Sequence, residues 1–316
     1  MKIKFGLLLP TRGIILNNSK PDFSKILSIA NIAENEKFES LWVGDSLTAK
    51  PRLDPLVTLS ALSTYTKKIL LGTAVLLPGL REPLTLCRSL NTLDVISEGR
   101  IIIAAGVGGA FTSSQIDEWK NVNVNPKERT KRLEEIIEIF KLSSSGNKFS
   151  FSGNHFNFKN VCIKPASVQK PHIKLLLACH SHSGNNNQYK RMAKYADGFI
   201  TISEKASTIS KLINSLENVW IQNGKNINQM DRTIYLTVNI NENKKKSKEE
   251  SDKFIKSYYG LNFWEETWGP FGTPEEVIQE IKTIMKTKIS RIILRFASFS
   301  PEKQLRLFLE KVYPQL

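Results

Sequence analysis

The residues best suited to chemistry lie in turns rich in glycine and hydroxyl groups. Gly106, Gly108 and Gly109 directly follow the apolar run Ile101–Ala105. Three glycines at a strand end let the backbone lie flat against a flat ligand such as a ring system, although a tight turn would explain them equally well. A dinucleotide fingerprint is disfavoured, because Phe111 stands where the third glycine of that motif belongs.

A second such turn spans residues 179 to 185, just before a helix that we expect to begin near Asn187. Amides and hydroxyls ahead of a helix favour phosphate binding. The candidate ligands in this turn are Ser181, Ser183 and Gly184. A zinc site is the weaker alternative, because an extended chain points Cys179 away from His180 and His182 and no fourth ligand is evident. We therefore expect no metal.

Asp45 and Ser46 follow the short apolar run Ser40–Val43. They are adjacent rather than arranged through a histidine, and the sequence has no Gly-x-Ser-x-Gly motif, so covalent hydrolysis is disfavoured. An aromatic group near residue 265 either walls an apolar pocket or forms a satellite core. Its members are Phe263, Trp264, Trp268 and Phe271.

Composition excludes several classes of protein. The 316 residues include 45 Lys and Arg against 30 Asp and Glu, a net charge of +15, with 41% hydrophobic residues. No apolar stretch approaches the roughly 20 residues of a membrane helix, and three distant cysteines fit a reducing, cytoplasmic setting. The dense basic run Lys244–Lys248 is followed by glutamates, which predicts a solvated face rather than a nucleic-acid site.

The elements that must position these turns follow a βα rhythm. Eight strands are predicted, at Lys2–Leu9, Ser40–Val43, Ile69–Leu76, Ile101–Ala105, Ile173–Ala178, Gly198–Ile202, Thr233–Ile240 and Arg291–Arg295. Helical patterns separate them, which predicts one α/β domain over residues 1–316, a (β/α)8 TIM barrel. Two insertions, Lys148–Lys170 after the fourth helix and Asn241–Pro270 after the seventh strand, are expected to cover the barrel mouth.

An ordered set of motifs resembles the luciferase-like monooxygenase superfamily and spans nearly the whole chain. The runs are Phe38–Asp45, Asp54–Leu56, Leu71–Leu76, Thr92–Arg100, Gly106–Gly108, Tyr195–Phe199 and Gly272–Glu276. The resemblance implies a barrel that binds FMN or the deazaflavin coenzyme F-420 at its mouth. It also implies a homodimer and, for the oxygen-using members, a supply of reduced flavin that a flavin reductase would provide.

By position in the family, a non-proline cis peptide behind the ring falls at Ala74–Val75. The resemblance further implies that Gly106 and Gly108 pass the ring edge and that the loop after strand five holds the phosphate, helped by Arg129 or Arg132.

Two departures stand out. Ser46 replaces a frequent family histidine beside the retained Asp45, and Phe111 replaces the glutamate of sugar-phosphate dehydrogenases, which argues against that activity. Proton transfer then falls to Asp45, to His180 or His182, or to water. Three arginines either recognise an acidic substrate or coenzyme tail or form ion pairs. They are Arg12, Arg81 and Arg295.

The sequence thus predicts a flavin-dependent oxidoreductase of the luciferase-like type, in which reduced FMN and oxygen act on a small organic substrate. The alternative is an F-420-dependent dehydrogenase or reductase that transfers hydride without oxygen. A non-redox barrel enzyme is disfavoured because no lysine or glutamate base ends a strand. Nucleic-acid binding would require aromatic residues interleaved with basic ones on one surface.

Overall fold

Eight parallel strands form a closed ring in the computed structural model, which describes residues 3–16, 20–181, 186–202, 204–260 and 269–316. The ring is built from β1 (Lys4–Leu8), β2 (Ser40–Val43), β3 (Leu70–Leu76), β4 (Ile101–Ala105), β7 (Lys174–Ala178), β8 (Gly198–Ile202), β9 (Asp231–Ile240) and β11 (Arg291–Phe296). Pairing of β8 with β9 closes it. The predicted (β/α)8 barrel and all eight predicted strands are confirmed.

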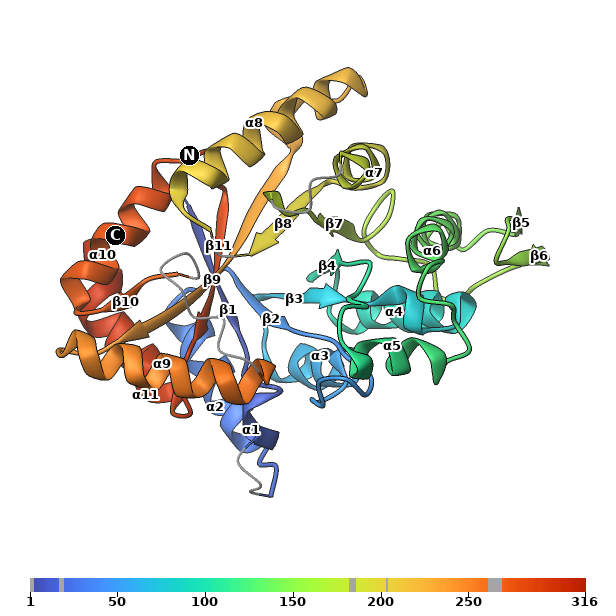
Figure 1. Cartoon of the computed structure of the whole chain (residues 1–316). Coiled ribbons are helices and arrows are strands. Elements are labelled where there is room, and N and C mark those ends of the chain that lie inside the picture. The colour runs from blue at the N-terminus through green and yellow to red at the C-terminus, as the bar shows by residue number, and fades with distance from the viewer. Residues whose placement is uncertain (1–2, 17–19, 182–185, 203, 261–268) are drawn as a thin grey trace.

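Helices surround this ring, as Figure 1 shows. They are α1 (Gly13–Leu16), α2 (Ser24–Asn35), α3 (Pro55–Tyr65), α4 (Pro83–Ile96), α5 (Ser113–Lys120), α6 (Arg129–Ser143), α7 (Asn187–Tyr195), α8 (Ala206–Gln222), α9 (Lys244–Tyr259), α10 (Pro274–Met285) and α11 (Pro301–Leu307). No helix of the described segments has the length and apolar character needed to span a membrane.

Local signals explain where several helices begin. Asp54 accepts the amides of Leu56 and Val57 ahead of α3, and Pro55 opens that helix. A capping box opens α10: Thr273 accepts the Glu276 amide while the Glu276 side chain accepts the Thr273 amide. These caps satisfy helix amides without help from the rest of the fold.

The inside of the barrel is filled by a cluster of apolar side chains, of which Trp42 is the largest. Trp42 is fully buried and donates its indole N–H to Ser40 Oγ at 2.8 Å. It lies between Gly6 and Gly72 of the two neighbouring strands, where a Cβ on Gly6 would stand 2.6 Å from the indole nitrogen. Glycine on both sides is therefore what lets a tryptophan occupy the barrel axis.

An ion-pair network closes the barrel below Trp42, at the amino ends of the strands. Arg291 donates to both carboxylate oxygens of Asp231 at 2.8 and 3.0 Å, and to Glu39 at 2.8 and 2.9 Å. Lys174 reaches Asp231 at 2.7 Å. Burial alone would raise the pKa of Asp231, but the two cations outweigh it and hold that pKa below its ordinary value. The bottom of the barrel is thus charge-compensated.

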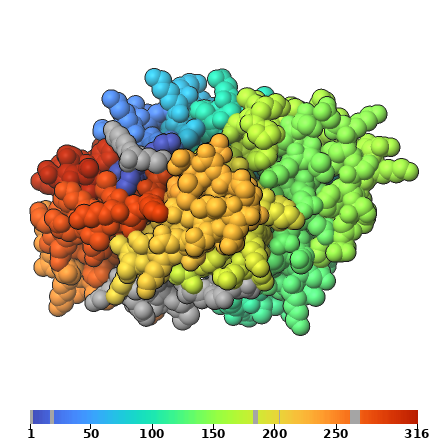
Figure 2. All heavy atoms as spheres, turned by 90° about the horizontal axis from the view of Figure 1, so that it is seen from above, coloured from blue at the N-terminus to red at the C-terminus, as the bar shows by residue number. Residues whose placement is uncertain are grey.

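The first predicted insertion does not cover the mouth. Its strands β5 (Phe149–Ser152) and β6 (Asn157–Val161) form a separate antiparallel hairpin. Glu135 on α6 accepts the amides of residues 154 to 156 in the hairpin turn. Figure 1 shows the hairpin outside α6, and in Figure 2 this segment forms one end of the molecule. The expectation of a lid was wrong here, because the insertion follows a helix, at the end of the barrel away from the mouth.

The second insertion contains α9, and the short strand β10 (Phe271–Gly272), which follows the insertion, pairs in parallel with the end of β9. The basic run begins α9, and Lys244, Lys245, Lys246 and Lys248 are exposed there. Phe271 packs beside Phe254 and Tyr258 of α9. The other three members of the predicted aromatic group lie outside the described residues.

Candidate active site

A bulge in β3 shapes one side of the barrel mouth. Ala74 is paired with Ala104 and Leu76 with Ala105, so Val75 is an extra residue with no partner on β4. The peptide between Ala74 and Val75 is cis, at the position that the resemblance indicated. A regular strand would turn these two side chains to opposite faces. Here both pack against the inner cluster of the barrel and stay partly exposed.

Gly106 and Ala178 extend this surface across β4 and β7. A Cβ on Gly106 would stand 2.8 Å from Val75 Cγ2 and 3.8 Å from the Ala178 Cβ. Ala178 is itself a partly buried neighbour of the inner cluster. We call Ala74, Val75, Gly106 and Ala178 the mouth floor. It presents only methyl groups and backbone, so its shape and chemistry fit one face of a planar aromatic ring such as a flavin.

The next two glycines are explained by protein neighbours rather than by a ligand. Gly108 has φ of +83°, and a Cβ there would stand 2.7 Å from the Trp119 ring. A Cβ on Gly109 would overlap the side-chain amide of Gln115. Arg129 donates to the Gly108 carbonyl at 3.2 Å and to Pro126. In this structure these residues shape the turn beside the floor, and their predicted cofactor contacts stay predictions.

Asp45 is held in a nearly buried ion pair. Arg81 places Nη2 3.0 Å from Oδ1 of Asp45, and its Nη1 contacts Oδ2. The Leu77 amide also donates to Oδ2, at 2.9 Å. Arg81 therefore follows the ion-pair alternative for the three arginines. A carboxylate with these partners positions the loop after β3, which argues against the predicted role of Asp45 as a proton carrier.

The Ser46 hydroxyl likewise forms its hydrogen bonds with other groups of the protein. Its hydroxyl donates to Glu118 Oε1 at 2.8 Å and accepts the Lys50 amide at 2.9 Å. Glu118 also accepts the amides of Thr48 and Ala49. The predicted catalytic role of Ser46 is disfavoured, because no hydroxyl hydrogen is left for a substrate. Sequence reasoning missed Glu118, and nothing local marks it, since its partners lie about 70 residues away in the chain.

The loop after β7 brings an unexpected carboxylate to the predicted phosphate site. Ser181 donates its hydroxyl to Glu204 at 2.6 Å and its amide to the same carboxylate at 3.4 Å. A phosphate at Ser181 would be repelled by this buried glutamate, so Ser181 is not available as a ligand in this arrangement. His180 exchanges backbone hydrogen bonds with the Gln188 side chain. Ser183, Gly184 and His182 lie outside the described residues.

The cysteines are not arranged for metal binding. Cys179 is buried in the outer core, and burial raises the pKa of its thiol to about 12. Within the described ranges, no three His, Cys, Asp or Glu side chains gather as ligands would.

Across the mouth from the floor, strand β9 and helix α9 supply tyrosines around two buried arginines, Arg12 and Arg295 of β11. Arg295 donates to Tyr259 Oη at 2.6 Å and to Thr237 Oγ1 at 2.7 Å. Its guanidinium carbon lies 5.0 Å from the ring centres of Tyr235 and Tyr258. Arg12 donates Nε to the Tyr258 carbonyl at 3.0 Å. The mouth thus has an apolar side and a cationic, aromatic side.

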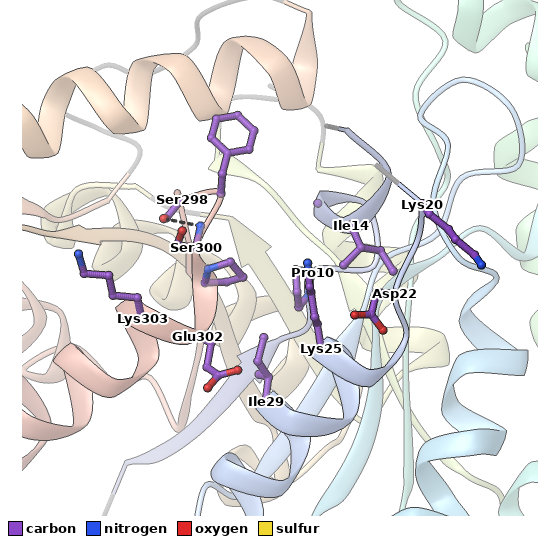
Figure 3. Close-up of a pocket in the computed structure, with 13 residues that line it drawn as sticks. Pro10, Ile14, Lys20, Asp22, Lys25, Ile29, Ser298, Ser300, Glu302 and Lys303 are labelled. Carbon is purple, nitrogen blue, oxygen red and sulfur yellow. Dashed lines mark hydrogen bonds between the residues drawn. The ribbon is translucent and has the colours of Figure 1, made fainter. Parts of the chain in front are cut away.

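A cavity of about 310 Å³ opens at the rim beside this cationic side, between β1 and α2 on one hand and the start of α11 on the other. Figure 3 shows Glu302 on one side of the cavity and Ile29, Lys25 and Asp22 on the other. Its carboxylates are already engaged, Asp22 with Ser24 and Glu302 with Ser28 and Arg306. A smaller gap, lined by both Pro10 and Arg295, lies between the rim cavity and the tyrosines.

A closed ring of parallel strands with surrounding helices defines the (β/α)8-barrel class, in which ligands bind at the carboxyl ends of the strands. The sequence profile described as luciferase-like monooxygenase matches residues 3–268, and this chain belongs to that family. Its relatives include proteins named F420-dependent dehydrogenases.

Two curated relatives illustrate how sequence identity and coverage differ among the matches. The "Uncharacterized protein Rv0953c" of Mycobacterium tuberculosis is 32% identical over 173 residues, which cover 55% of this chain and 58% of that protein. This match therefore spans less than two thirds of that relative. An "F420-dependent glucose-6-phosphate dehydrogenase" of Amycolatopsis mediterranei is 22% identical over 315 residues, covering 90% of this chain and 92% of that enzyme.

Solved structures share the fold. Monooxygenase RslO1 from Streptomyces bottropensis superposes with a TM-score of 0.81 at 19% identity, over 99% of both chains. An F420-dependent secondary alcohol dehydrogenase in complex with an F420-acetone adduct superposes with a TM-score of 0.82, also at 19% identity, over 100% of this chain and 99% of that one.

Proposed function

We propose that this chain binds the ring of FMN on the mouth floor and acts as a flavin-dependent monooxygenase on a small organic substrate. The observation that carries the proposal is the bulge that turns both Ala74 and Val75 into the mouth beside Gly106 and Ala178. This small apolar surface would support one face of the ring and leave the other open. The bound reduced flavin would supply electrons to oxygen.

The protein's own contribution is mainly binding and exclusion of water. The floor carries no ionisable group, and the nearest carboxylate after β2, Asp45, is neutralised by Arg81. His180, at the end of β7, is the residue that we propose to hold or release a proton beside the ring. A floor without ionisable groups suits chemistry in which the cofactor does most of the work.

Hydride transfer to or from coenzyme F-420 is the second candidate. The names of the curated relatives favour it, since several are F420-dependent dehydrogenases. Oxidation of an alcohol needs a base for the hydroxyl proton. With Asp45 and Ser46 engaged, His180 is the predicted base that remains among the described residues.

Equilibrium binding tests the proposal. FMN and F-420 are titrated separately into the purified protein under identical salt, and ligand fluorescence is followed. Ala178→Leu adds bulk to the floor and is expected to weaken ring binding about tenfold or more, because the ring cannot occupy the same space. Ala178→Ser adds a single oxygen at the same site and is expected to retain most of the affinity.

Each outcome separates the candidates. Saturable FMN binding that Ala178→Leu weakens, followed by oxygen uptake with reduced FMN, supports the monooxygenase. Preference for F-420 with the same dependence on Ala178 supports hydride transfer. Binding of neither ligand, or binding that Ala178→Leu leaves unchanged, would refute a ring site on the mouth floor.

A further inference from the structure

We propose that the cationic side of the mouth binds an oxyanion of the substrate, a carboxylate or phosphate group, on Arg12, Lys50, Arg52 and Arg295. We call these four residues the mouth cation cluster. This inference rests on the proposed function, because the anion is assigned to the substrate of the oxidoreductase whose ring lies on the floor.

The cluster converges on two tyrosines of α9 from three separate parts of the chain. Measured to the centre of the Tyr258 ring, the guanidinium carbons of Arg12 and Arg52 lie at 5.2 and 5.8 Å. Lys50 Nζ lies 4.8 Å from the centre of the Tyr259 ring. Arg295 lies within 5.2 Å of both rings. The aromatic faces hold the cations together but cancel none of their charge.

The cluster retains hydrogen-bond donors that the described protein does not use. Lys50 Nζ has no hydrogen-bond acceptor among the described residues, and Arg52 donates only through Nε, to the Lys50 carbonyl at 3.2 Å. Both side chains are half-buried. Arg295 is 3% exposed, and its Nε is buried without any acceptor in the described structure. Buried donors normally find acceptors, so these point to a ligand that supplies them.

Charge compensation is missing at the cluster, whereas two other arginines of the barrel have it. Arg81 is paired with Asp45 and Asp54, and Arg291 with Glu39 and Asp231. In the described segments no carboxylate lies within ion-pair distance of a cluster member.

The cations also act on one another. Burial and the neighbouring Arg52 both lower the pKa of Lys50 below its ordinary value. An anion bound among these groups would relieve this repulsion and gain charge-assisted hydrogen bonds.

Arg52 connects the cluster to the mouth floor. Its guanidinium packs against Gly44, so closely that a Cβ built on Gly44 would overlap Arg52 Nη1. The same Gly44 Cβ position is 3.6 Å from the carbonyl oxygen of Ala74. The anion site is therefore adjacent to the proposed ring site. A substrate bound at both would be a small organic acid or phosphate ester whose reacting carbon lies close to its charged group.

Calorimetric titration of the full chain tests this assignment. The probes are benzoate and inorganic phosphate, with neutral benzamide as the uncharged analogue of benzoate, each with and without saturating FMN. Arg52→Gln and Lys50→Gln each remove one charge from half-buried side chains. Each is expected to weaken anion binding roughly tenfold to a hundredfold, as loss of a hydrogen bond to a charged group does. Arg88→Gln removes the same charge from an exposed position on α4 and serves as the matched control.

Saturable binding of at least one anion, absent for benzamide and weakened in both cluster variants but not in Arg88→Gln, would support the site. No anion binding with or without FMN, or equal binding by Arg52→Gln, Lys50→Gln and Arg88→Gln, would overturn it. Competition between benzoate and FMN would assign the cluster to the phosphate of the cofactor and also overturn it. Failure of the proposed function is distinguishable from failure of the anion site. In that case neither FMN nor F-420 binds in the fluorescence titration, while the anion still binds.

Discussion

Arg81, in the loop after β3, forms an ion pair with Asp45, which follows β2. Arg81 Nη2 lies 3.0 Å from Asp45 Oδ1, and the Asp45 side chain is 1% exposed. The pair joins the ends of β2 and β3 directly beside the mouth floor. Its geometry makes Asp45 a positioning residue.

Asp45→Asn is therefore expected to act mainly on stability. Leaving Arg81 half-buried beside a neutral amide should cost about 3 kcal/mol in the free energy of unfolding, in the range for breaking one side of a buried pair. Urea unfolding measures this, and Asp45→Asn combined with Arg81→Gln should cost less than the two single changes added together. Normal stability with abolished turnover would instead restore Asp45 as a proton carrier.

Ser46→Ala provides a second test of a residue beside the mouth. Loss of the hydrogen bonds to Glu118 and from the Lys50 amide should lower the free energy of unfolding by about 1 kcal/mol. The affinity for FMN should stay within about twofold, since the hydroxyl faces the protein. Ser89→Ala, on the exposed face of α4, is the control and should change neither quantity. A large loss of turnover at unchanged stability would contradict this structural role.

The mouth cation cluster should be visible in the titration of a tyrosine. Burial alone would raise the pKa of Tyr258, but the four cations outweigh it and place that pKa below its ordinary value of about 10. A spectroscopic pH titration should show one tyrosine that ionises at a lower pH than the others. This signal should be absent in Tyr258→Phe. Arg52→Gln should raise this pKa, because it weakens the field that favours the phenolate.

The same group links stability to pH. Because the folded pKa of Tyr258 is depressed, its contribution to stability is complete above about pH 10 and is lost as pH falls through the folded pKa. Unfolding measured across this window should therefore show a smaller rise with pH in Tyr258→Phe than in the natural chain. An identical rise of stability with pH in both proteins would show that another group causes the pH dependence.

Gly72→Ala tests the packing of the barrel axis. The added methyl group would overlap the six-membered ring of Trp42, which is fully buried and cannot move aside. We expect a loss of about 1–3 kcal/mol in the free energy of unfolding, as for overpacked cores. In Gly13→Ala the methyl group meets only Pro10 Cβ at 3.3 Å, so this control should be near neutral in the same thermal or urea unfolding experiment.

Local patterns in the sequence were sufficient to predict the barrel. Ser40–Val43, Ile101–Ala105 and Gly198–Ile202 were predicted with their observed bounds, because short apolar runs between turns are a property of the chain itself. The capping box at Thr273 and the helix start at Asn187 are equally local. The ordered motifs also placed the cis peptide at Ala74–Val75.

Only the tertiary structure decided which predicted site residues have protein partners. The carboxylates that occupy Ser46 and Ser181 come from Glu118 and Glu204, and no spacing in the chain announces either contact. Such contacts depend on which loops meet at the carboxyl ends of neighbouring strands. Residue type and local spacing predict a hydroxyl at the site, but not whether another side chain already holds it.

The mouth cation cluster has the same origin. Arg12 and Tyr258 are 246 positions apart, yet closure of the ring through β11 and β1 brings them within a hydrogen bond. Sequence reasoning named Arg12 and Arg295 as candidates and gave two alternatives for their role, recognition of an acidic substrate or coenzyme tail and ion pairing. It missed Lys50 and Arg52, since a basic residue in a loop has no local signal of burial. Barrel closure determines which charges share one low-dielectric site, and this sharing is a property of the fold alone.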